Sequence, residues 1–181
     1  MATKRTAPSW SNVKTSLAEV DRTGLLRLLQ DLYAANKDSQ TFLHARLGLG
    51  DDVLKPYKAL IDRWLWPDVY KNQNTSVASA KKPIADYRKS VGQAEGLAEL
   101  MVFYCERASG FSNEVGVHDE SYLNALVRMF EQALKTIASL TEAQRQPLWD
   151  RLDDVRHNAH NIGYGVGEDM DDLLAKYGAE E

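Results

Sequence analysis

Residues 120–140 read ESYLNALVRMFEQALKTIASL, and this stretch decides the fold class. Its large apolar residues recur at spacings of three and four, so in a helix they would share one face: Leu123, Leu126, Val127, Phe130, Leu134 and Ile137. Polar and charged residues fill most of the positions between them. The stretch therefore predicts an amphipathic helix, and we expect Leu126, Val127, Phe130 and Leu134 to be buried.

The same spacing recurs along most of the chain. It predicts further helices over residues 23–37, 40–47, 51–65, 76–91 and 95–109, one from Thr141 through Ala159, and a short last helix ending near 178. We expect Pro83 to kink or divide the helix over 76–91. No segment alternates as a strand does. The sequence thus predicts an all-α fold, a single domain of about eight to nine helices over residues 11–178 behind a flexible tail over 1–10. Short connections suit a bundle or, slightly better, an irregular array of antiparallel helix pairs.

Composition places the chain among ordinary globular proteins. It has 181 residues, 44% hydrophobic and 27% charged, with no apolar run long enough to span a bilayer. Residues 1–8 lack the apolar stretch of a secretory signal. The one cysteine, Cys105, cannot form an intramolecular disulfide, and its apolar neighbours indicate a buried thiol. We expect a reduced, cytoplasmic protein.

Charge is divided along the chain. Residues 1–93 hold 15 Lys and Arg against 9 Asp and Glu, a net +6, whereas residues 94–181 hold 7 against 17, a net −10. This asymmetry favours an ordered electrostatic encounter, with another copy or with a partner of opposite sign. The overall charge of −4 argues against bulk nucleic-acid affinity.

Five segments follow one another along the chain: LLRLLQDLYAANKDSQTFLHARL at 25–47, YKALIDRWLW at 57–66, AKKPIADYRK at 80–89, GLAELMVFYCER at 96–107 and YLNALVRMFEQAL at 122–134. Taken in this order, they resemble a family of uncharacterised bacterial helical proteins. The resemblance implies a helical fold. It implies no activity and carries over no catalytic residue.

The end of the helix through Ala159 offers a candidate metal site. Asp153, His157 and His160 lie at i, i+4 and i+7 and share a face, and two imidazoles with a carboxylate are a possible ligand set. The outer two lie roughly 10 Å apart along the helix axis, so a site would need a further ligand such as Asp169 or Asp171. The simpler interpretation is a polar helix flank, with Asp153 pairing with His157.

Two weaker patterns lie nearby. Arg151 and His157 match the loose Arg-x(4–6)-His spacing of a class of helical ribonucleases, although chance supplies such a pair in a chain of this composition. The loop GYGVG at 163–167 follows a helix instead of a strand, and acidic residues occupy the next helix start, so it does not predict a phosphate site.

Basic residues cluster in the helix over 76–91. Lys81, Lys82, Arg88 and Lys89 could bind phosphates or an acidic protein surface, although a solvated basic face is the simpler interpretation. Trp66 lies two positions after Trp64, so it points away from that residue and could be an exposed anchor for a partner.

These observations favour a non-enzymatic interaction protein, a helical scaffold with a basic front half and an acidic back half. It would take no cofactor, and it would bind a protein partner or another copy through charge-complementary surfaces, away from membranes. The first alternative is a metal-dependent hydrolase or nuclease that uses Asp153, His157, His160 and the acidic residues after the glycine loop. The second is nucleic-acid binding through residues 81–89, which requires these charges to be contiguous with others such as Lys55, Lys58 or Lys71.

Overall fold

The structure is a computed structural model that describes residues 7–50, 52–71 and 73–178. Helices account for all the regular structure in these ranges, without a strand. In chain order they are α1 (Trp10–Ala18), α2 (Arg22–Ala35), α3 (Lys37–Leu47), α4 (Lys55–Leu65), the 3-10 turn η1 (Val69–Lys71), α5 (Val77–Ser90), α6 (Ala94–Val115), α7 (Glu120–Ile137), α8 (Glu142–Ala159) and α9 (Val166–Gly178). The predicted all-α fold of about eight to nine helices is confirmed.

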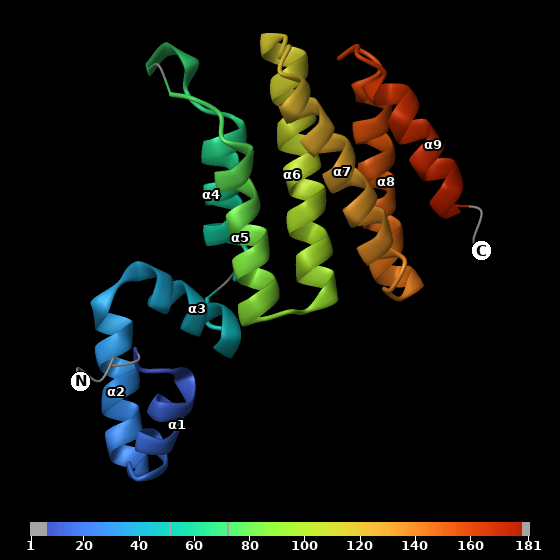
Figure 1. The fold of residues 1–181 in the computed structure, drawn as a ribbon. Coiled ribbons are helices and arrows are strands. Elements are labelled where there is room, and N and C mark those ends of the chain that lie inside the picture. Colours follow the sequence, from blue (N-terminus) through green and yellow to red (C-terminus); the bar gives the residue numbers. More distant parts are fainter. Residues whose placement is uncertain (1–6, 51, 72, 179–181) are drawn as a thin grey trace, which may run out of the picture.

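Helices α4 to α9 form an array of three antiparallel hairpins, which we call the body (Figure 1). The hairpins are α4 with α5, α6 with α7, and α8 with α9. Helices α4, α6 and α8 pack in one layer, and α5, α7 and α9 cover them from the other side. Helix α6 touches both neighbouring hairpins, so it is the centre of the body.

The core lies between these two layers. Helix α7 places Leu126, Phe130 and Leu134 there with none of their surface exposed, as predicted, whereas Val127 lies at the edge and is half-buried. Helix α6 is apolar over most of its circumference and is buried along most of its length. Cys105 is wholly buried, and this desolvation raises the pKa of its thiol well above the ordinary value.

The helix ends follow ordinary capping chemistry. The Asp119 carboxylate accepts the backbone N–H of Ser121 at 2.9 Å and so begins α7. Gly116 ends α6 with a φ of 72°, a left-handed conformation that favours glycine. Pro83 does not divide α5, which runs unbroken from Val77 to Ser90, so one half of that expectation is wrong.

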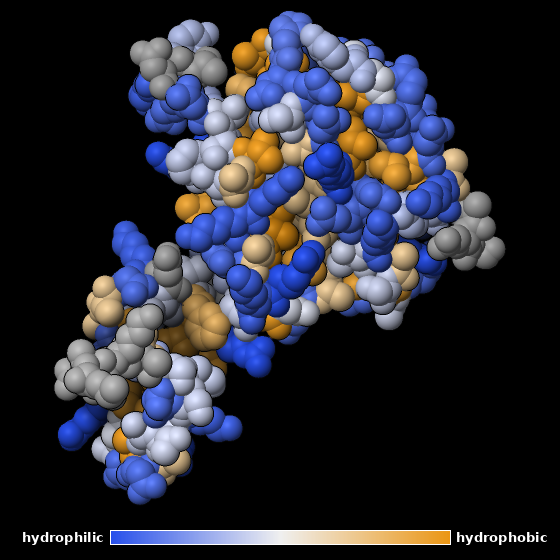
Figure 2. All heavy atoms as spheres, viewed as in Figure 1, coloured by the Kyte–Doolittle hydropathy of each residue, from blue (hydrophilic) through white to orange (hydrophobic). Residues whose placement is uncertain are grey.

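Helices α1 to α3 form a separate arm at one end of the body (Figure 1). Helix α2 packs against α3, and α3 packs against α5. Neither α1 nor α2 contains a buried residue. Ten large apolar side chains of the arm keep between 37% and 70% of their surface, in part visible as orange at lower left in Figure 2: Trp10, Val13, Leu25, Leu26, Leu28, Leu29, Leu32, Tyr33, Phe42 and Leu47.

Two features of the N-terminal half differ from the sequence interpretation. Helix α2 begins at Arg22 because the Asp21 carboxylate accepts the N–H of Gly24 at 2.8 Å, so the cap is Asp21 instead of Thr23. Helix α1 begins at Trp10, inside the expected tail, whose first six residues lie outside the described ranges.

Among the described residues, no helix combines the length and the apolar character needed to cross a membrane.

Candidate functional site

The residues of the candidate metal site pair with other side chains. Asp153 accepts a hydrogen bond from Arg156 at 2.8 Å, and His160 Nε2 lies 3.2 Å from an Asp171 oxygen. His157 and Asp169 are exposed. In the part of the chain that the structure describes, no three His, Cys, Asp or Glu side chains gather as a metal would require. The geometry of this helix end therefore supplies no support for the metal-dependent enzyme.

The Trp66 side chain packs against the body. The centre of its ring lies 6.1 Å from that of Phe111, and the Arg107 guanidinium lies over the Trp66 ring, 4.0 Å from the ring centre. Arg107 in turn pairs with Asp62 at 2.5 Å. A Cβ at Gly110 would lie 2.6 Å from the ring, so glycine is needed for this close approach. Trp66 is thus half-buried and packs within the body, and we do not assign it to a partner-binding surface.

The basic residues of α5 divide into two faces. Lys82 and Lys89 are exposed and line a hollow between α5 and the arm. Lys81 and Arg88 do not line that hollow. Burial, and then the nearby Arg128, lower the pKa of the Lys81 ammonium. None of the four makes an ion pair with another described residue.

Two of the three further lysines that nucleic-acid binding would recruit form ion pairs. Lys58 pairs with Glu99 at 2.7 Å, and Lys71 pairs with Asp68 at 3.0 Å, whereas Lys55 is exposed. The ion pairs neutralise the charges of Lys58 and Lys71, which weakens the support for a contiguous basic surface.

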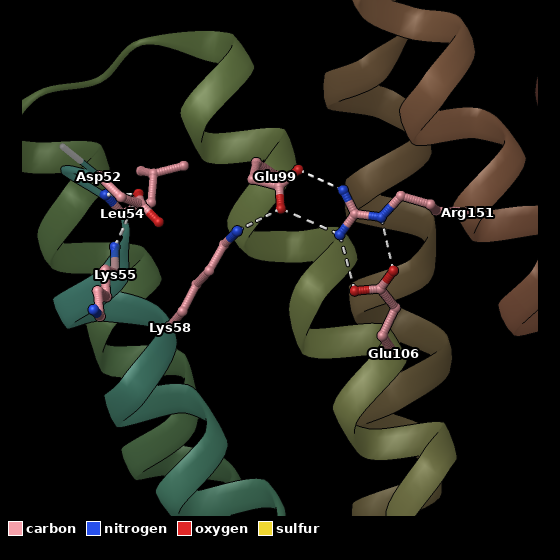
Figure 3. Close-up of polar contacts among 7 residues, drawn as sticks. All are labelled: Asp52, Leu54, Lys55, Lys58, Glu99, Glu106 and Arg151. Carbon is pink, nitrogen blue, oxygen red and sulfur yellow. Dashed lines mark hydrogen bonds and ion pairs between the residues drawn. The ribbon is translucent and has the colours of Figure 1, made fainter.

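Four charged residues join helices α4, α6 and α8, and we call them the ion-pair cluster (Figure 3). Arg151 of α8 donates to both oxygens of Glu99, at 2.6 and 3.2 Å, and to both oxygens of Glu106, at 2.7 and 2.9 Å. Lys58 of α4 adds its ammonium to Glu99. Planar guanidinium groups suit such two-pronged contacts with carboxylates, so the cluster fixes the spacing of three helices.

The electrostatics of the cluster are balanced. Burial acts to raise the pKa of Glu99, but hydrogen bonds from Arg151 and Lys58 hold that pKa below its ordinary value. The hydrogen bonds that Arg151 donates to Glu106 and Glu99 outweigh desolvation and raise the pKa of its guanidinium. Both shifts favour the charged forms of Glu99 and Arg151 at neutral pH.

The chemistry open to the ion-pair cluster is limited. A hollow of about 450 Å³ adjoins it, lined in part by Glu95, Glu99, Gln144 and Arg151. Arg151 is already clamped by two carboxylates, and Glu95 accepts a hydrogen bond from Gln144 at 2.8 Å. A catalytic acid or base needs a free, positioned proton site, and a nucleophile needs an adjacent base. Glu99, Glu106 and Arg151 are held by one another, so we interpret the cluster as a structural clasp.

The hollow beside the arm has a different character, and we call it the partner hollow. It measures about 400 Å³ and lies where α3 meets α4 and α5. Its apolar lining includes Phe42, Leu60 and Pro83, of which Phe42 and Leu60 are exposed. Its polar lining includes Lys82, Asp86 and Lys89. An apolar centre with a polar, solvent-accessible rim is the general plan of a protein-binding site.

Sequence reasoning found only part of these sites. It identified Lys82 and Lys89 but not Phe42 and Leu60, because the three segments that meet at the hollow are distant in sequence. It also missed Glu99 and Glu106. A signal was present, since these two glutamates lie two turns apart in a helix that is otherwise strongly apolar, and buried carboxylates need partners.

Comparisons with known proteins returned no match, whether to family models, to curated proteins or to solved structures.

Proposed function

We propose that this chain is a cytoplasmic protein-binding module without catalytic activity, and that it binds an acidic, amphipathic segment of a protein partner in the partner hollow. The observation that carries the proposal is the pair Lys82 and Lys89, exposed and without an ion pair in the described residues, at the edge of an apolar hollow. A scaffold with a basic front surface was the interpretation that charge alone favoured. The partner hollow supports this interpretation, because two of the four basic residues of α5 lie at its edge.

The shape of the hollow suits one anchoring side chain. At about 400 Å³ it can take a large aliphatic or aromatic group against Phe42 and Leu60. Burying such a group contributes roughly 1.5–3 kcal/mol. A helix that lays its apolar face into a groove uses this kind of anchor.

The charges at the edge of the hollow determine which charge the partner should carry. Lys82 and Lys89 are seven residues apart, so they rise from the same face of α5, two helical turns from each other. Asp86 lies between them in sequence and lines the same hollow, which leaves a net positive edge. This positive edge should raise the rate at which a carboxylate-bearing segment associates with the hollow. The increase in rate should fall as the salt concentration rises, because exposed charges are screened over about 10 Å at 0.1 M salt.

A peptide library displayed on phage, selected against the purified chain, tests the proposal. We expect enriched peptides to carry Asp or Glu one or two helical turns from a large apolar residue. Their affinity, measured by fluorescence anisotropy, should fall about tenfold or more in the Lys82→Glu, Lys89→Glu double variant, because attraction becomes repulsion. Raising the salt concentration should weaken the wild-type complex.

The matched control lies on the same helix. The Lys81→Glu, Arg88→Glu double variant makes the same change in net charge outside the hollow, and it should keep affinity within about threefold, as remote charges act weakly. Equal losses of peptide affinity in the two variants would show that only the net charge of the chain, and not the position of the lysines, affects binding. Peptides without acidic residues, or a hollow variant that binds as well as the wild type, would also refute the proposal.

A further inference from the structure

The arm presents more apolar surface than it can cover. Helices α1 and α2 bury no residue of their own, and nearly all of the core lies in the body. Short helices in water gain most of their stability from packing an apolar face, so a helical arm without a core needs a surface to pack against.

Two apolar hollows lie open between the arm helices. One, of about 360 Å³, lies between α2 and α3 and is lined by Leu29, Leu32 and Phe42 among others. The second, of about 340 Å³, lies between α1 and α2 and is lined in part by Val13 and Leu28. Both belong to the arm, and only Phe42 also touches the partner hollow.

The amount of exposed apolar surface matches one side of a stable interface. The ten large apolar side chains of the arm together expose the equivalent of about five whole side chains. At roughly 100 Å² of apolar area for each large side chain, this surface is on the order of 500 Å². A standard interface buries about 800 Å² on each partner, of which roughly 55–65% is apolar, or about 500 Å².

The body offers no counterpart to this surface. Away from the arm and the partner hollow, the described ranges expose few large apolar residues, namely Tyr70, Val115 and Tyr164, with Leu49 just past the end of α3. If a second copy of this chain covers the apolar surface of the arm, the matching apolar surface on that copy is therefore its own arm.

Charge permits that pairing. Residues 10–47 hold five Lys and Arg against four Asp and Glu, a net charge of +1, so two arms repel each other weakly. Contact of the same surface on both partners closes around a two-fold axis and stops at two copies. We infer that two copies of this chain associate arm to arm as a closed dimer, through the apolar face of α1 to α3. This inference does not rest on the proposed function, and the two surfaces share only Phe42.

Sedimentation velocity over a range of protein concentrations tests the inference. We expect the mass of two chains. Leu29→Asp and Leu32→Asp together should raise the dissociation constant of the dimer about a hundredfold or more, because two-fold symmetry places each buried charge in the interface twice. The matched control is Leu60→Asp, an equally exposed leucine outside the arm, which should stay dimeric. Far-UV circular dichroism checks that each variant is folded.

A second measurement does not depend on those variants. Cys105 is buried, so a nitroxide attached at Gln30→Cys on α2 labels the arm alone. The dimer predicts a defined distance between the two labels by pulsed electron resonance. A monomer at every concentration up to about 100 μM, a mass that grows beyond two chains, a dimer unaffected by the arm substitutions, or the absence of a distance would each overturn the inference. Loss of peptide binding in Leu60→Asp with the dimer intact would separate the two proposals.

Discussion

Replacing Arg151 by methionine removes the centre of the ion-pair cluster at nearly constant length. Glu99 keeps only Lys58 as its partner, and Glu106 loses both of its hydrogen bonds to Arg151. Removing one partner of a fully buried pair costs about 3–5 kcal/mol, whereas an exposed pair contributes about 0.2–1 kcal/mol. The Arg151 side chain is one-third exposed and that of Glu99 only 18%. We therefore expect the free energy of unfolding to fall by about 2 kcal/mol.

Urea unfolding measures this loss through a shift in midpoint at unchanged slope. A double-mutant cycle with Glu106→Gln should give a coupling of about 1 kcal/mol, because each substitution already removes the contact that the other would break. The control is Arg88→Met, an exposed arginine outside any described ion pair, which should change stability by less than about 0.5 kcal/mol. Additive effects, or an Arg151→Met variant as stable as this control, would refute the view of the cluster as a clasp.

Three further outcomes are expected. Phe130→Ala should lower the free energy of unfolding by about 3–5 kcal/mol in the same assay, because Phe130 is wholly buried. The pKa of Glu99 in the folded chain lies below its ordinary value of 4.5, so the ionised carboxylate stabilises the fold fully above pH 4.5. This stabilisation is lost as the pH falls through the lower pKa of the folded state. The urea midpoint should therefore fall less steeply with acidification in the Glu99→Gln variant than in the wild type. The double variant His157→Ala, His160→Ala should fold with a loss below about 1 kcal/mol, and elemental analysis of the wild type should find no stoichiometric transition metal, whereas about one metal per chain, absent from the variant, would promote the enzyme.

Periodicity predicted the helices well because it records which face of a helix is apolar. It does not record what that face meets. Residues 25–33 of α2 and 123–137 of α7 carry the same spacing, yet the α7 face is buried and the α2 face is exposed. The difference depends on which helices lie opposite, and that is set by contacts between distant segments.

Side-chain pairing was the least predictable part. The sequence suggested that Asp153 pairs with His157, four residues away. Instead Arg156, three residues away, reaches Asp153 and also Asp171 of α9, because its longer side chain spans both helices. Arg151 and Glu99 are 52 positions apart, so no local pattern could have joined them.

The lone thiol has a practical consequence. Cys105 lies on the innermost helix of the array, with no surface exposed, and its raised pKa leaves little reactive thiolate at neutral pH. An alkylating reagent can reach it only when the core of the body opens, and local opening of the arm, which contributes nothing to that core, does not expose it. The rate at which Cys105 is alkylated in the native chain therefore measures how often the core of the body opens. More frequent local openings elsewhere do not contribute to that rate.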